Sequence, residues 1–254
     1  MPTFAETIPM ELSQEEKIIE TTAAYVQQAL AGAESGHDWF HIYRVWQTAR
    51  AIAEGESARL PEPAGDGSGV NLLVVELGAL LHDIADAKFH NGDEAIGPIK
   101  ARFFLETLDL PAAIIGQVVN IVQHISFKGG NHFKGQGKGQ LSNESQADFY
   151  TPELGIVQDA DRLDAIGAIG IARAFNYGGF KNRAIYDPAI APALHMTKEQ
   201  YKQSTAPTIN HFYEKLLLLK DKMNTATGKA MACERHLFME RFLEQFYAEW
   251  EGKA

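Results

Sequence analysis

The residues best suited to chemistry stand in three separate segments of the chain. A histidine-aspartate doublet, His82-Asp83, lies within a run of mostly apolar residues. Two histidines stand upstream, in the segment 37–45, and several aspartates stand downstream, in the segment 158–164. Imidazoles and carboxylates on the buried face of a helix are usually paired, hydrogen-bonded or bound to a metal. The three segments together therefore predict the ligands of one metal site.

Helical spacing limits which of these side chains can meet. His41 stands at the edge of an apolar stripe, from which it can point inward. His82 and Asp83 are about 100° apart on a helix, so both reach one ion only if they straddle the line that faces it. Asp159 and Asp161 are two positions apart and do not share a helix face. One of these two aspartates can be a ligand, and the periodicity does not choose between them.

The elements that must position these residues are all predicted to be helices. Apolar residues recur at spacings of three and four along most of the chain. Two segments with proline and glycine, 61–69 and 177–192, and a loop or lid rich in glycine, polar residues and lysine, 128–147, interrupt the pattern. No useful strand-like alternation and no internal repeat is present. We expect helices over about 11–33, 42–53, 73–84, 93–108, 114–125, 154–175, 198–223 and 229–251, with the last two separated near Gly228.

This pattern predicts an all-α protein, a single-domain helical bundle over residues 1–254. The core of the site is expected within roughly 36–176, with a C-terminal helical pair, 196–252, packed on it. The net charge of -10 argues against a nucleic-acid or anionic-membrane surface, because both need a basic stripe. The single cysteine, the lack of a signal-peptide pattern and the lack of a membrane-spanning apolar stretch predict a cytoplasmic location.

The ordered set of residues resembles the HD superfamily of metal-dependent phosphohydrolases. The segment His41-Ile42-Tyr43-Arg44-Val45 matches a His-x-x-Arg-Val pattern of that family, and Ala160-Asp161-Arg162-Leu163 matches Ala-Asp-Arg-Leu. The resemblance implies an HD-type helical fold and the metal ligands His41, His82, Asp83 and Asp161. It therefore selects Asp161 over Asp159, and leaves the second doublet, His37-Asp38, as a supporting pair.

The resemblance extends from about residue 36 to residue 235. Over this length the chain is similar to a bacterial subgroup of HD hydrolases associated with nucleotide pyrophosphohydrolysis. It implies one divalent cation, with Mn²⁺ expected first and Mg²⁺, Fe²⁺, Ni²⁺, Co²⁺ or Zn²⁺ as alternatives, since His/Asp sites accept several metals.

Asp86 follows His82 by one turn and is the candidate catalytic acid or base. An ion pair between Asp86 and Lys88 is the alternative explanation.

A phosphorylated substrate carries more negative charge than one divalent cation balances. We therefore expect substrate contacts from Arg44, Lys88, His124 and Lys215, although each is also explained as an ordinary surface or core residue. The predicted partner is a small phosphorylated molecule, a nucleotide in particular, and neither nucleic acid nor membrane. The sequence leaves the exact substrate and the oligomeric state open.

Two other functions fit parts of the same pattern. A dinuclear-iron oxygenase on this scaffold would need further histidine ligands, and His90, His124 and His132 stand between Asp83 and Asp161. A non-catalytic metabolite-binding protein would keep the pocket without turnover. The number of bound metal ions separates the oxygenase from the hydrolase, and a measurement of turnover separates the hydrolase from the binding protein.

Overall fold

The computed structural model describes residues 12–33, 38–59, 69–85, 95–125, 149–194, 196–197, 200 and 203–253. These residues contain helices and no strand, which confirms the predicted all-α class. None of the described helices combines the length and the apolar character of a membrane span. The elements are α1 (Gln14–Ala29), α2 (Trp39–Ser57), α3 (Leu72–Leu81), α4 (Ile96–Leu105), α5 (Ala112–His124), α7 (Pro152–Asp164), α8 (Gly167–Phe180), α10 (Thr208–Glu214), the 3-10 helix η2 (Leu216–Lys222) and α11 (Ala226–Trp250).

Helix starts are set locally by capping side chains. Where such a cap is present, a side-chain oxygen accepts a hydrogen bond from a backbone N–H in the first turn, a contact worth about 1 kcal/mol. Asp38 caps α2 in this way and accepts from the N–H of His41, so the cap also fixes the start of the first histidine segment. The capping residues are Ser13, Asp38, Asn71, Thr151 and Thr225.

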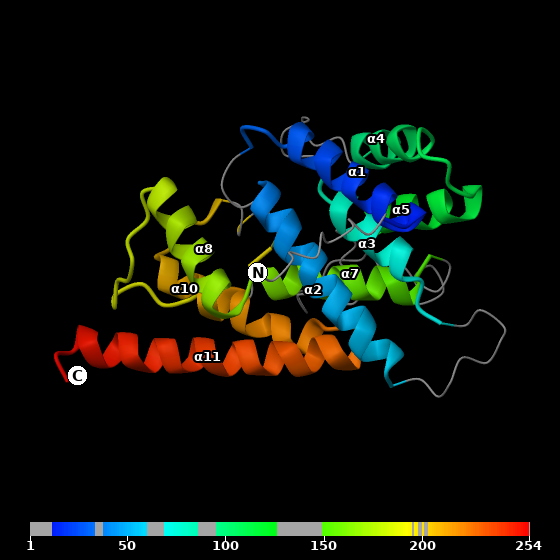
Figure 1. The fold of residues 1–254 in the computed structure, drawn as a ribbon. Coiled ribbons are helices and arrows are strands. Elements are labelled where there is room, and N and C mark those ends of the chain that lie inside the picture. Colours follow the sequence, from blue (N-terminus) through cyan, green and yellow to red (C-terminus); the bar gives the residue numbers. More distant parts are fainter. Residues whose placement is uncertain are drawn as a thin grey trace, which may run out of the picture.

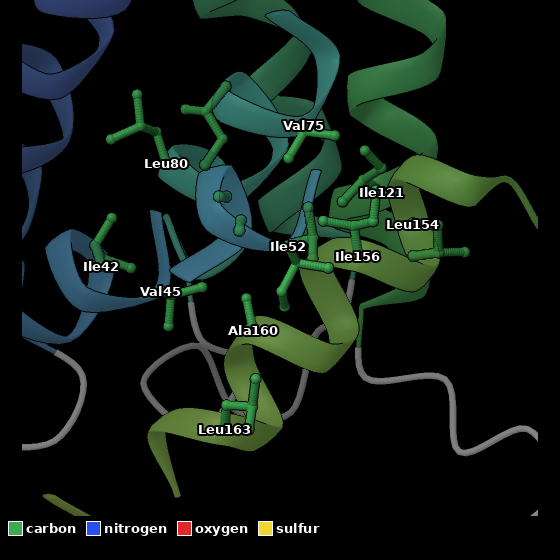
Figure 2. Close-up of a cluster of buried hydrophobic side chains, with 14 of the residues drawn as sticks. Ile42, Val45, Ile52, Val75, Leu80, Ile121, Leu154, Ile156, Ala160 and Leu163 are labelled. Atoms are coloured by element: carbon green, nitrogen blue, oxygen red, sulfur yellow. The ribbon is translucent and has the colours of Figure 1, made fainter. Parts of the chain in front are cut away.

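Helix α2 crosses the middle of the fold and packs against α3 and α7 (Figure 1). Helix α3 also contacts α1, α5 and α7, while the long α11 runs along the opposite edge against α7, α8 and η2. Figure 2 shows the apolar side chains that fill the space between α2, α3, α5 and α7, Ile52, Leu80 and Ile156 among them. One buried apolar cluster reaches from Ile19 of α1 to Leu243 of α11. Such a continuous core is what a single domain requires. The domain boundaries stay a prediction.

The prediction of one helix over 154–175 is wrong, because the structure has two helices there. Helix α7 ends at Asp164, and α8 begins at Gly167, whose φ is +73°. Glycine adopts this left-handed conformation without the steric cost of a side chain, so the chain turns sharply here. The segment from Tyr177 to Phe180, predicted to be irregular, is the last turn of α8.

The predicted C-terminal pair of long helices is also corrected. Residues 204–207 are not helical, and only the short α10 and η2 follow before residue 223. Pro207 stands at the N-cap of α10, where its missing N–H breaks no helical hydrogen bond. Gly228 does not separate two helices, because α11 begins at Ala226 and continues through it to Trp250.

Candidate metal centre

Three predicted ligands from three helices converge in the structure. His41 comes from α2, His82 from the C-cap of α3 and Asp161 from α7. Each offers one ligand atom, and the three atoms lie within 4.8 Å of one another. His41 Nε2 is 3.6 Å from Asp161 Oδ1, and the two imidazole rings meet edge to face with centroids 5.3 Å apart. The histidines are buried and Asp161 is 42% exposed, so the group opens to solvent on its carboxylate side.

The ring of His41 is oriented by a carboxylate behind it. His41 Nδ1 lies 2.8 Å from Asp164 Oδ2, in a buried contact. An ionised carboxylate only accepts hydrogen bonds, so Nδ1 carries a proton, and in the neutral ring Nε2 is then the nitrogen with a lone pair, on the side of Asp161. Carboxylate-histidine pairs of this kind are the usual support for a metal-binding imidazole, because they fix its tautomer and its orientation.

Asp164 is itself held by two arginines. Arg44 donates from Nε to Oδ1 at 2.6 Å and from Nη2 to Oδ2 at 3.0 Å, and Arg173 donates from Nη1 to Oδ2 at 2.5 Å. Burial alone would raise the pKa of Asp164, but the hydrogen bonds from His41 and Arg44 and the charge of Arg173 outweigh it and bring this pKa well below its usual range. Asp164 is therefore an ionised, buried acceptor.

His82 supplies the observation that best tests whether a cation fits. Its Nδ1 lies 2.7 Å from the carbonyl oxygen of Ala79, which can only accept, so Nδ1 carries the proton. Its Nε2 is buried and has no hydrogen-bond partner among the described residues. A buried acceptor left unpaired costs about 1–3 kcal/mol. A divalent cation between His41, His82 and Asp161 would satisfy this nitrogen, and two imidazoles with a carboxylate suit several such metals.

The choice between Asp159 and Asp161 has a structural explanation. The carboxylate of Asp159 is completely buried and accepts hydrogen bonds from the backbone N–H groups of Asn224 and Thr225 and from the hydroxyl of Thr225, all at 2.8–2.9 Å. It also accepts from Arg162 at 3.2 Å. Burial raises the pKa of Asp159, against the effect of these hydrogen bonds. Asp159 therefore binds the start of α11, and Asp161 faces the histidines.

Asp83, the fourth predicted ligand, is half-buried and is not a member of the three-residue group. It directly follows His82, which caps α3, so the two side chains leave the backbone in different directions. Its role as a ligand stays a prediction. Asp86 and Lys88 lie outside the described residues, as do His37, His90 and His132.

The other predicted substrate contacts take different places. Arg44 is bound to Asp164, as described above. His124 ends α5, where its Nδ1 lies 2.9 Å from the carbonyl oxygen of Asn120 and its ring stacks on Phe149. Lys215 is exposed at the C-cap of α10, a helix that packs against α8 and η2. The structure does not bring His124 or Lys215 into the three-residue group, and their contacts with substrate stay predictions.

Sequence reasoning did not assign to Asp164 and Arg173 the roles that they have in the site. A signal for Asp164 was present, because it stands three positions after Asp161 and so shares a helix face with it. No local signal marks Arg173, which comes from the next helix and reaches the carboxylate only through the turn at Gly167.

Comparison with known proteins agrees with this geometry. The model of the HD domain matches residues 39–166, a stretch that contains all three converging residues. The chain belongs to the HD domain family. The predicted membership is thereby confirmed, and so is the predicted HD-type helical fold.

Relatives of similar length extend the match over nearly the whole chain. YpgQ of Bacillus subtilis is 34% identical over 249 residues, covering 95% of this chain and 96% of YpgQ. The structure of an HD-superfamily hydrolase from Bacillus thuringiensis is 38% identical and covers 93% of this chain and 98% of its own, with a TM-score of 0.68. The structure of YpgQ in complex with ADP is 30% identical, covers 93% and 97%, and has a TM-score of 0.65. This HD-domain protein is thus similar over nearly its whole length to YpgQ and to a protein named as an HD-superfamily hydrolase.

Proposed function

We propose that this HD-domain protein is a metal-dependent phosphohydrolase that cleaves a phosphoanhydride or phosphoester bond of a nucleotide. The observation that carries the proposal is the buried Nε2 of His82, which has no hydrogen-bond partner in the described part of the chain and lies beside His41 and Asp161. Family membership supports hydrolysis, and the location of the protein is proposed to be cytoplasmic.

The chain's own residues have defined tasks in this reaction. When bound, a divalent cation supplies Lewis-acid chemistry, because it lowers the pKa of a water molecule and polarises a phosphoryl oxygen. His41, His82, Asp83 and Asp161 would hold it, and the network behind His41 would keep that ring in one tautomer. The exposed side of Asp161 leaves room for a phosphate to approach from solvent. Asp86 is proposed to accept and return the proton that the reaction moves.

The nucleotide is proposed on the basis of a relative and of charge. YpgQ, which is similar over nearly the whole chain, has been crystallised in complex with ADP. The protein carries a net charge of -10, so a phosphate chain needs local cations to bind. Arg44, Lys88, His124 and Lys215 are proposed to provide them. The specific reaction proposed is release of pyrophosphate from a nucleoside triphosphate.

The experiment measures phosphate and pyrophosphate release from nucleoside mono-, di- and triphosphates. Metal-free protein is reloaded separately with Mn²⁺, Mg²⁺, Fe²⁺, Ni²⁺, Co²⁺ or Zn²⁺, and the bound ions are counted. His82→Gln is compared with His236→Gln. His236 is also a buried histidine, and its Nδ1 has no hydrogen-bond partner among the residues that the structure describes, but its Nε2 pairs with Glu240 at 3.2 Å on α11.

We expect one bound ion per chain and metal-dependent release, both lost in His82→Gln and kept in His236→Gln. Equal release by wild type and His82→Gln would overturn the proposal. Two irons per chain would favour the oxygenase instead. One bound ion without turnover of any nucleotide would favour a protein that binds a metabolite.

A further inference from the structure

Helix α8 contributes an arginine to the hydrogen-bond network behind the metal centre. Arg173 Nη1 donates to Asp164 Oδ2 at 2.5 Å and to the backbone carbonyl oxygen of Asp164 at 3.2 Å. Oδ2 is the same oxygen that accepts the hydrogen bond from His41 Nδ1. A single guanidinium nitrogen therefore contacts both the side chain and the main chain of the residue that orients the first ligand.

The two arginines on Asp164 are not equivalent. Arg44 stands one turn after His41 on the same helix, so it ties the carboxylate to α2 alone. Arg173 comes from α8, beyond the residues 39–166 that the HD model matches. It is also the arginine that bonds the main chain of Asp164, the last residue of α7. Arg173 thus ties the centre to a helix outside the matched segment.

The turn between α7 and α8 is also held by α11, so Arg173 acts from a fixed position. Arg235 of α11 donates from Nη1 to the carbonyl oxygen of Leu163 at 2.6 Å. Its side chain also packs against Gly167, where an added Cβ would lie 3.0 Å from Arg235 Cβ. Leu163, Asp164 and Gly167 are therefore braced by two neighbouring helices, and little freedom is left for the carboxylate of Asp164.

We propose that Arg173 is a positioning residue for the metal centre: it fixes Asp164, which holds His41 as the Nδ1-protonated tautomer and so directs Nε2 toward the cation site. The inference rests on the proposed function only in requiring that the centre binds a metal. Asp164 is the residue one step behind the ligand His41, and loss of such a partner typically changes metal affinity 10–100-fold. Loss of Arg173 leaves Oδ2 with fewer donors and the end of α7 without one of its contacts.

The test uses Arg173→Met, which removes every donor but keeps an unbranched side chain, and Arg173→Lys, which restores one cationic donor. The matched control is Arg183→Met. Arg183 stands shortly after α8 and donates to the carbonyl oxygen of Ser204 at 2.6 Å. The control variant therefore also loses a hydrogen bond from an arginine to a carbonyl oxygen, but not one to Asp164. Two properties are measured without substrate: the dissociation constant for Co²⁺, and the tautomer of His41 in metal-free protein from ¹H–¹⁵N NMR.

We expect Arg173→Met to weaken Co²⁺ binding about tenfold and to add the second tautomer of His41 to the spectrum. Arg173→Lys should recover part of both, and Arg183→Met should match wild type. Co²⁺ affinity and tautomer equal to those of Arg183→Met would overturn the role of Arg173 and leave the hydrolase proposal intact. Weakened binding in a protein that hydrolyses no nucleotide would support Arg173 and refute the hydrolase. Absence of Co²⁺ binding by wild type would refute both.

Discussion

The carboxylate of Asp164 lies behind the ring of His41, with Asp164 Oδ2 at 2.8 Å from Nδ1, while Nε2 of the same ring faces Asp161 at 3.6 Å. The two aspartates stand three positions apart on α7 and contact opposite nitrogens of one imidazole. They differ in burial, since Asp164 is 4% exposed and Asp161 is 42% exposed. The carboxylate of Asp164 therefore belongs to the folded core, and that of Asp161 can be reached by a ligand from solvent.

This difference predicts separate effects for two matched substitutions. Asp164→Asn removes the negative charge that Arg44 and Arg173 share, and breaking a buried ion pair costs about 3–5 kcal/mol. We expect the free energy of unfolding to fall by about 3 kcal/mol, the low end, because both arginines are partly exposed. Urea unfolding of the metal-free protein measures it, and Co²⁺ affinity should fall in the same variant.

Asp161→Asn is the control for that experiment. Because Asp161 is partly exposed, the substitution should change the free energy of unfolding by no more than about 0.5 kcal/mol while abolishing Co²⁺ binding. Equal losses of stability in the two variants would contradict the division of roles between these aspartates.

Asp159 gives a second prediction, because it is the aspartate that the sequence left as an alternative ligand. Its oxygens accept from the N–H groups of Asn224 and Thr225. Asp159→Asn would bring an amide NH₂ close to these donors, and an unsatisfied buried group costs about 1–3 kcal/mol. We expect a loss of stability in that range with Co²⁺ affinity unchanged. Loss of Co²⁺ binding without loss of stability would instead make Asp159 a ligand.

The helices around the site could be predicted from periodicity because they bury one face each. Ile42, Val45 and Ile52 recur at helical spacing along α2, and all three are completely buried. The break at Gly167 could not be predicted in this way, since apolar residues continue on both sides of it. It depends on contacts of the turn with Arg235, which is distant in the sequence.

The residues of the site likewise fall into those that local sequence patterns identify and those that depend on contacts distant in the sequence. His41, His82 and Asp161 could be named because their order and local patterns are those of a family. Residue spacing alone did not separate Asp159 from Asp161, since the answer depends on where Asn224 and Thr225 lie, more than sixty positions later. The network behind His41 depends on a turn and a further helix, which local patterns do not describe.

His211 gives a prediction for the pH dependence of stability. Burial, together with the charges of Lys215 and Arg183, lowers the pKa of His211 to about 4. An unfolded chain takes up this proton near pH 6.5, so stability should fall as the pH drops from about 6.5 to about 4, by about 3 kcal/mol in all. His211→Gln should remove that share of the slope in urea unfolding at several pH values. An NMR titration of His211 near 6.5 in the folded protein would contradict the prediction.

Gly228 and Gly116 predict opposite effects of the same substitution. A Cβ at Gly228 would lie 2.6 Å from Asp159 Oδ2 and 2.7 Å from Thr225 Oγ1, both fixed by hydrogen bonds to each other. We expect Gly228→Ala to lower the free energy of unfolding by about 1–3 kcal/mol, as overpacking does. Gly116 is exposed within α5, and no atom of the described segments lies within 4 Å of an added Cβ, so Gly116→Ala should raise the free energy of unfolding by about 0.5–1 kcal/mol. Thermal and urea unfolding of both variants measure whether each substitution lowers or raises the free energy of unfolding. Stabilisation by Gly228→Ala would show that the start of α11 is not tightly packed against Asp159.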